Sequence, residues 1–89
     1  MKLKQGIIIS EVNGEFVAVP SGDASKNFNG MIRMNRTAAF IAKMLQIGAG
    51  EQEIISALLS EYDVDEEIAR EDFVAVLSQF DELKLLDHE

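Results

Sequence analysis

The sequence contains no cysteine. Without cysteine the chain can form no disulfide, no thiolate nucleophile, and no zinc or iron–sulfur site built on sulfur ligands. This lack is compatible with a reducing cytoplasm, where we expect the protein to act. The only histidine, His88, stands in the short tail after Asp87, and chain ends of this kind usually fray. We therefore expect no metal site and no catalytic histidine.

Long apolar runs are missing as well. No run approaches the roughly 20 residues that a helix needs to span a bilayer, so we expect no membrane partner. The apolar stretch Ile7–Ile9 stops at Ser10, which leaves no room for the apolar region of a secretory signal. With 89 residues, 47% of them hydrophobic, the chain has the size and composition of one small globular domain, residues 1–89.

Basic residues are scarce in the second half. Residues 1–50 hold six Lys or Arg and three acidic residues, whereas residues 51–89 hold two Lys or Arg and thirteen acidic residues. Proteins that bind nucleic acid neutralise phosphates with clustered Lys and Arg, so we expect no nucleic-acid partner. The acidic half has two interpretations. It is a solvated surface that keeps a small protein soluble, or a surface complementary to a basic partner.

Two runs rich in β-forming residues, Gly6–Val12 and Glu15–Pro20, flank the pair Asn13-Gly14. This pattern predicts a hairpin, because a type I′ turn needs positive φ at both central residues. The turn predicts two cross-strand pairs, Ser10 with Val17 and Ile8 with Val19. Proline has no N–H to donate, so we expect the second strand to stop at Pro20.

The polar segment Ser21–Asn29 predicts a loop, with Phe28 fixing it to the core. It lacks the glycine spacing and the Lys-Ser/Thr pair of a phosphate-binding loop. A third strand is predicted over Gly30–Met34. Alternation assigns Met31 and Arg33 to one face of this strand and Ile32 and Met34 to the other.

Three amphipathic helices are predicted after the strands. The first follows the N-cap Asn35 and ends at Gly48-Ala49-Gly50, the second spans about Glu51–Tyr62, and the third about Glu66–Leu83. Their apolar stripes are, in order, Thr37, Phe40, Ile41, Met44 and Leu45; Ile54, Ile55, Leu58, Leu59 and Tyr62; and Ala69, Phe73, Val76, Leu77, Phe80 and Leu83.

The third helix also has a mixed edge, formed by Ile68, Asp72 and Gln79 beside its apolar stripe. A border of this kind next to a strand lines a groove, or else Asp72 pairs with a nearby Arg or caps a donor. The spacing of Asp63, Asp65 and Glu67 is similar to that of a calcium loop, but the required Gly and distal Glu are missing. We expect these carboxylates to cap helices.

The sequence offers no set of a nucleophile, a base and a group that would orient the base. We therefore predict a binding module with no catalytic residues rather than an enzyme. The order of elements predicts an α+β fold. We expect a small winged-helix-like domain in which an N-terminal three-stranded antiparallel sheet is followed by three helices.

From Gly30 to Asp87 the sequence resembles the PqqD-like peptide-recognition domains. The family pattern begins with a strand followed by Asn-x-Thr and small residues, and continues with an acidic helix entry and a Tyr-Asp-Val helix end. It closes with an acidic-aromatic segment and a leucine-rich tail. The matching segments are Met34–Ile41, Glu51–Ile54, Tyr62–Asp65, Glu71–Phe73 and Leu85-Leu86, with Lys84 where the family usually has Gly. Residues 1–29 show no signature of the family.

The resemblance implies a recognition element for ribosomally synthesised, modified peptides, similar to coenzyme PQQ synthesis protein D. Such a domain binds the leader segment of a precursor peptide as an added strand and presents it to a modifying enzyme, often a radical S-adenosylmethionine protein. It needs no cofactor of its own. The peptide-binding residues it implies are Met31, Ile32, Arg33 and Met34 on the strand, and Ile68, Asp72, Val76 and Gln79 on the third helix.

Two other functions share this order of elements. A winged-helix DNA-binding regulator would read DNA with its third helix, but residues 63–72 hold one Arg and six acidic residues. A protein-binding adaptor outside peptide modification is the other alternative.

Overall fold

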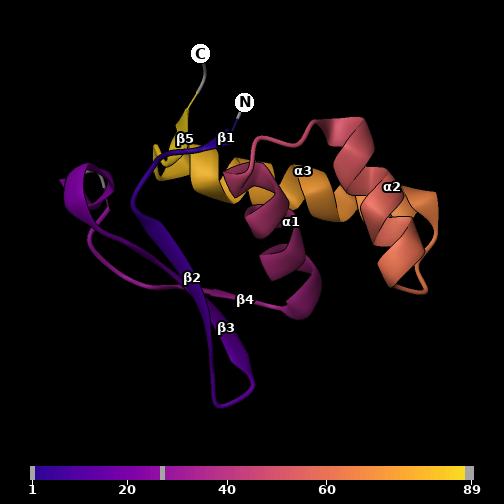
Figure 1. The fold of residues 1–89 in the computed structure, drawn as a ribbon, viewed down its shortest axis with the longest axis horizontal. Helices are drawn as coiled ribbons and strands as arrows, with labels where there is room; N and C mark the ends of the chain where they lie inside the picture. Colours follow the sequence, from indigo (N-terminus) through magenta and orange to yellow (C-terminus); the bar gives the residue numbers. More distant parts are fainter. Residues whose placement is uncertain (1, 27, 88–89) are drawn as a thin grey trace.

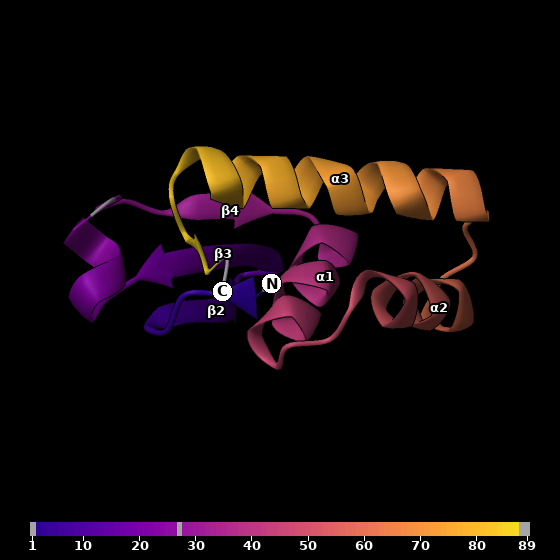
Figure 2. The same cartoon turned by 90° about the horizontal axis from the view of Figure 1, so that it is seen from above.

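The computed structural model describes residues 2–26 and 28–87 (Figure 1). A three-stranded antiparallel sheet, in the order β2-β3-β4, precedes three helices in the chain, as predicted. Figure 2 shows α1 between the sheet and α2, and α3 running alongside β4. The expectation for His88 lies outside the described residues.

The hairpin pairs β2 (Ile7–Val12) with β3 (Glu15–Pro20). Asn13 and Gly14 join the strands with φ values of 53° and 83°, which are the positive angles of the predicted turn. The observed register confirms both predicted pairs, Ser10 with Val17 and Ile8 with Val19.

The turn also fixes which backbone groups face which neighbouring strand. A two-residue turn closes on a hydrogen-bonded pair, and hydrogen-bonded pairs then alternate with non-bonded ones. Phe16 and Ala18 of β3 therefore direct their N–H and C=O groups toward the next strand, β4. The Ser21 N–H donates to the Gly6 carbonyl at 2.8 Å, in agreement with this alternation.

The third strand, β4 (Ile32–Met34), begins two residues later than predicted. Its register pairs Ala18 with Ile32, so the ladder would next bond at Pro20 and Gly30. The nitrogen of Pro20 faces β4 in this alternation and has no hydrogen to donate, so the ladder ends at Ile32. Met31 precedes the strand and is 57% exposed.

The predicted loop holds a short 3-10 helix, η1 (Gly22–Lys26), and Phe28 packs against the core as expected. The helices are α1 (Arg36–Gln46), α2 (Glu51–Glu61) and α3 (Glu66–Glu82). The predicted cap at Asn35 is confirmed, and of the three carboxylates expected to cap helices, Asp65 does so. The Asn35 side chain accepts from the Ala38 N–H at 2.8 Å, and Asp65 accepts from the Ile68 N–H at 3.0 Å.

The core lies between the helices and one face of the sheet. The large residues buried most completely are Phe80, Ile41, Leu45, Ile54, Ile55, Leu58 and Leu85. The predicted stripes are wrong at Leu59, which is 38% exposed. In α1 the prediction missed the buried Ala39 and Ala42, and Phe40 packs against the core but is only partly buried. Close approach of α1 to its neighbours needs the small alanines, and Phe40 instead meets Tyr62 edge to face at 5.6 Å between ring centroids.

Two very short strands, β1 (Lys2–Leu3) and β5 (Leu86–Asp87), pair antiparallel and join the two ends of the described chain. They were not predicted. The chain reaches β5 through Lys84, whose φ is 59°, a left-handed angle at which glycine is the favoured residue. The Leu85 N–H then donates to the Phe80 carbonyl at 2.9 Å and closes the end of α3.

Within residues 2–26 and 28–87 no helix has both the length and the apolar character needed to cross a membrane.

Candidate functional site

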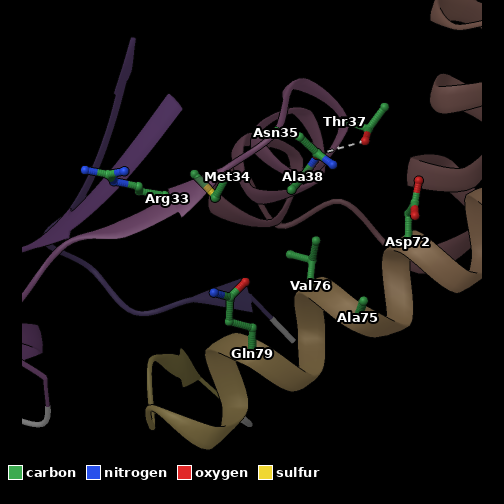
Figure 3. A pocket seen from close by; sticks show the side chains of 9 residues that line it. All are labelled: Arg33, Met34, Asn35, Thr37, Ala38, Asp72, Ala75, Val76 and Gln79. Carbon is green, nitrogen blue, oxygen red and sulfur yellow. Dashed lines mark hydrogen bonds between the residues drawn. The ribbon is translucent and has the colours of Figure 1, made fainter. Parts of the chain in front are cut away.

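A groove of about 210 Å³ lies between β4 and α3 (Figure 3). Nine residues line it: Arg33, Met34, Asn35, Thr37, Ala38, Asp72, Ala75, Val76 and Gln79. One wall is the strand and the start of α1, and the other wall is the middle of α3.

The strand wall is held in place by the cap of α1. The Asn35 side-chain oxygen accepts from the Ala38 N–H at 2.8 Å and from the Thr37 hydroxyl at 3.0 Å. These two bonds fix the point where β4 turns into the helix. Met34 is partly buried, so its flexible thioether chain gives this wall an apolar lining.

The helix wall consists of Asp72, Ala75, Val76 and Gln79. Their spacing of three, four and seven residues places all four on one side of α3. Val76 is 5% exposed and points toward Ala38 at the start of α1, whereas Asp72 lies near Thr37 at one end of the groove (Figure 3). The groove thus has an apolar centre with polar groups at its ends.

Asp72 does not serve the structural roles that the sequence left open. The nearest Arg on its helix, Arg70, instead bonds Glu66 at 2.8 Å and Glu51 at 3.2 Å, which ties α3 to α2. In the described part of the chain the Asp72 carboxylate has neither an ion-pair partner nor a hydrogen bond. Its charge is therefore available to a ligand in the groove.

The outer edge of β4 has unpaired backbone groups at Arg33. Arg33 lies opposite Val17, whose N–H and C=O bond β2, so the pair is a non-bonded one. The N–H and C=O of Arg33 consequently point away from β3, toward the groove side of the sheet edge. No described strand covers this edge.

The structure brings together five of the eight predicted peptide-binding residues: Arg33, Met34, Asp72, Val76 and Gln79. The other three lie elsewhere. Ile32 is 3% exposed and belongs to the core, Met31 lies on the outer face of the sheet, and Ile68 is in the first turn of α3, away from the groove.

Four lining residues were not predicted: Asn35, Thr37, Ala38 and Ala75. The sequence predicted Asn35 as the N-cap and Thr37 as part of the apolar stripe of the first helix, and it placed Ala38 only among the small residues of the family pattern. A signal for Ala75 exists, because it stands three residues after Asp72 and four before Gln79 on the same side of the helix.

The opposite face of the sheet carries a second hollow of about 400 Å³. Its lining is Ser10, Val12, Asn13, Glu15, Val17, Val19, Met31 and Arg33. Ile8, Val12, Val19 and Met31 on this face are all exposed large apolar residues, and we call it the outer face. Arg33 lines both hollows, and its side chain extends away from α3 in Figure 3.

Comparisons with known proteins bear on the fold and on the family. Two solved structures share the fold. One, described as TbiB1 in complex with the TbiA(beta) leader peptide, is 20% identical with a TM-score of 0.77, covering 100% of this chain and 98% of that one. The other, a lasso peptide synthetase B1 complexed with the leader peptide, is 25% identical with a TM-score of 0.69, covering 91% and 89%. No curated protein sequence matches the chain.

The resemblance seen in residues 30–87 predicted a PqqD-like domain. The family model confirms it and also extends over the hairpin, where the sequence showed no signature. The model described as coenzyme PQQ synthesis protein D (PqqD) matches residues 8–86, and the chain therefore belongs to the PqqD family.

Proposed function

We propose that this protein binds the leader segment of a ribosomally synthesised precursor peptide and presents the peptide to a modifying enzyme. The leader adds as a strand to the free edge of β4 and packs its side chains into the groove against α3. The observation that supports this most directly is the unpaired edge at Arg33 beside the groove. Strand addition gives affinity through backbone hydrogen bonds and specificity through side-chain pockets.

The two similar structures support the same function, because both are described as complexes with a leader peptide. The chemistry of the groove favours binding over catalysis. Its one hydroxyl, that of Thr37, donates to the amide oxygen of Asn35, which is not a base that could activate it. We therefore propose a binding module without catalytic activity, acting in the cytoplasm where ribosomal precursors are made.

The modifying enzyme is the second partner. Its assignment to the radical S-adenosylmethionine class rests on the family resemblance alone. Co-purification of the protein with the enzymes encoded beside its gene, with and without the precursor, tests that assignment.

The experiment for leader binding needs a cognate precursor, which a search for a short precursor-peptide gene among the neighbouring genes would supply. We would titrate the N-terminal segment of that precursor into isotopically labelled protein and follow the backbone amide signals by NMR. We expect the largest shifts at residues 31–35 and at Asp72, Ala75, Val76 and Gln79. Saturable binding with shifts confined to another surface would overturn strand addition at β4, and no binding would overturn the proposed function.

A winged-helix DNA-binding regulator is the rival function. Charge neutralisation supplies essentially all non-specific DNA binding, and α3 begins with Glu66 and Glu67. We expect no measurable affinity for duplex DNA at physiological salt. A gel-shift titration checks this, and a salt-dependent micromolar complex would favour the regulator.

A further inference from the structure

The register of the sheet determines where the side chains of an added strand fall. The inference about the leader sequence rests on the proposed function, in which a leader adds as a strand to β4. The only backbone groups of β4 that point outward belong to Arg33, so the leader residue that pairs with Arg33 anchors the added strand. Paired residues on neighbouring strands direct their side chains to the same face, and the residues on either side direct theirs to the opposite face.

The Arg33 side chain belongs to the outer face, so the paired leader residue must also lie there. Among the described residues, Arg33 is the only cation that lines the outer hollow, and it makes no ion pair with a described carboxylate. Its strand neighbour on this face, Met31, is apolar and 57% exposed. A carboxylate on the paired leader residue would therefore meet a cation with no competing partner.

Glu15 is the one acidic residue that lines the same hollow. It stands on β3, whereas the leader would lie on the other side of β4. The added strand and β3 would be two strand spacings apart, or about 10 Å, which is close to the Debye length in 0.1 M salt. Repulsion between Glu15 and a leader carboxylate is thus largely screened, and Arg33 lies between the two.

The two leader residues that flank the anchor face the groove. Between its polar ends this groove presents Met34, Ala75 and Val76. Apolar side chains fit this lining because they remove the remaining accessible surface of Met34 and Ala75 from water.

We infer that the protein selects leader segments with an apolar–acidic–apolar pattern, in which the acidic residue pairs across the strands with Arg33 on the outer face. Arg33 is then a specificity-determining residue through its side chain as well as an anchor through its backbone. Opposite charges on directly paired strand residues change affinity by up to about five-fold.

The test begins with random peptides displayed on phage and selected on the wild-type protein. Counter-selection uses Ala75→Trp, which fills the groove from an exposed helix position and leaves Arg33 in place. Peptides that bind the wild type and fail on this variant use the groove. We expect them to share an Asp or Glu between two apolar residues.

A charge exchange then isolates the pair. The best peptide, and its analogue with Lys in place of the acidic residue, are titrated by calorimetry into wild type, Arg33→Glu and Arg36→Glu at about 0.15 M salt. Arg33→Glu should weaken the acidic peptide and strengthen the Lys analogue, each up to about five-fold. Arg36→Glu, an equal charge change in the first turn of α1, should leave the preference for the acidic peptide intact.

The outcomes separate the two proposals. Groove-dependent peptides without an acidic preference, or an acidic preference that Arg33→Glu does not reverse, overturn the inference and leave leader binding in place. If no peptide is selected and the natural precursor segment also fails to bind, the proposed function is wrong and the inference falls with it. Circular dichroism of each variant confirms that it folds.

Discussion

The two outer edges of the three-stranded sheet differ in how they are protected. At the β2 edge, the outward carbonyl of Ile7 accepts a hydrogen bond from the Gln46 side chain at 2.6 Å, and Glu11 adds a charge. At the β4 edge, Arg33 has outward backbone groups, and a groove with an apolar centre runs alongside. Edge strands invite pairing with another chain, and charges or covering groups prevent it. The β2 edge is therefore protected in part, at Ile7 and by the Glu11 charge, whereas the β4 edge is open and lies beside a groove.

The difference indicates where a peptide can be added. An open edge alone would accept any extended chain, but the β4 edge has α3 beside it, so an added strand must also fit Val76 and Asp72. In the proposed binding mode, the backbone of β4 would supply the attraction and α3 would supply the selection. Each prediction below changes one of these two edges and leaves the other as a reference.

Arg33→Pro should have the largest effect. Proline removes the outward donor that the leader needs, while its missing N–H makes no bond within the sheet, so binding should fall by at least about 100-fold with the fold retained. Calorimetry with the precursor's N-terminal segment measures the affinity, and circular dichroism checks the fold. Two controls separate the causes.

Glu11→Pro removes an equivalent outward donor at the β2 edge and should leave binding unchanged. Arg33→Ala removes the side chain but keeps the N–H, so its loss should stay within about five-fold. If Glu11→Pro loses as much affinity as Arg33→Pro, the two edges do not differ in function. If Arg33→Ala loses as much affinity as Arg33→Pro, the side chain of Arg33 and not its N–H explains the effect.

Asp72→Lys should come next. It keeps the helix propensity but reverses the charge at one end of the groove, so a leader with a basic residue there should bind about five-fold more weakly. Glu71→Lys makes the same charge change on the side of α3 outside the groove and serves as the matched control. If both variants lose affinity equally, net charge rather than the groove explains the effect, and titration at higher salt would abolish it.

Asn35→Ala should destabilise the protein by about 0.5–2 kcal/mol, because it removes the side-chain acceptor that caps α1 at the end of β4. Urea denaturation measures the free energy of unfolding. Asn35→Asp keeps an acceptor oxygen and should stay close to wild type. An unchanged denaturation midpoint in Asn35→Ala would mean that the cap contributes nothing to stability.

Gln46→Ala should have the smallest effect, a loss of about 1 kcal/mol, since it removes one partly buried hydrogen bond to Ile7. It also exposes the β2 edge, so we expect self-association at high concentration to increase, which sedimentation velocity measures. Gln52→Ala on α2, which removes only an exposed hydrogen bond from Arg70 at 3.5 Å, is the reference. Equal stability of the two variants would contradict a protective role for Gln46.

Much of the fold was predictable because short sequence patterns specify turns and helix starts. Asn13-Gly14 determined the hairpin register, and Asn35 and Asp65 marked two helix starts, because each depends on residues only a few positions apart. Family membership was also predictable, from segments spaced along the chain. The pairing of Leu3 with Leu86 was not, because strands of two residues show no periodicity and join opposite ends of the sequence.

The groove was predicted in part. Alternation correctly separated Arg33 from Ile32 and Met34, but it could not show that Ile32 is covered by the core while Met34 reaches the groove. Ile68 shares a helix edge with Asp72 in projection, yet it lies a turn too early to meet the strand. Which turns of α3 lie beside β4 depends on tertiary packing. Helical periodicity alone cannot predict that position. The peptide-binding roles of these residues, and the likeness to a winged helix, stay predictions.

Pro20 has a consequence for how quickly a bound leader dissociates. By ending the β3–β4 ladder it leaves β4 only three residues long, with one residue whose backbone can hold a partner. Differences in affinity between related complexes lie mostly in the dissociation rate. A leader attached through so short an edge should therefore leave quickly once its side chains lose their fit in the groove. Rapid exchange of this kind suits a carrier that delivers one peptide and must then accept the next.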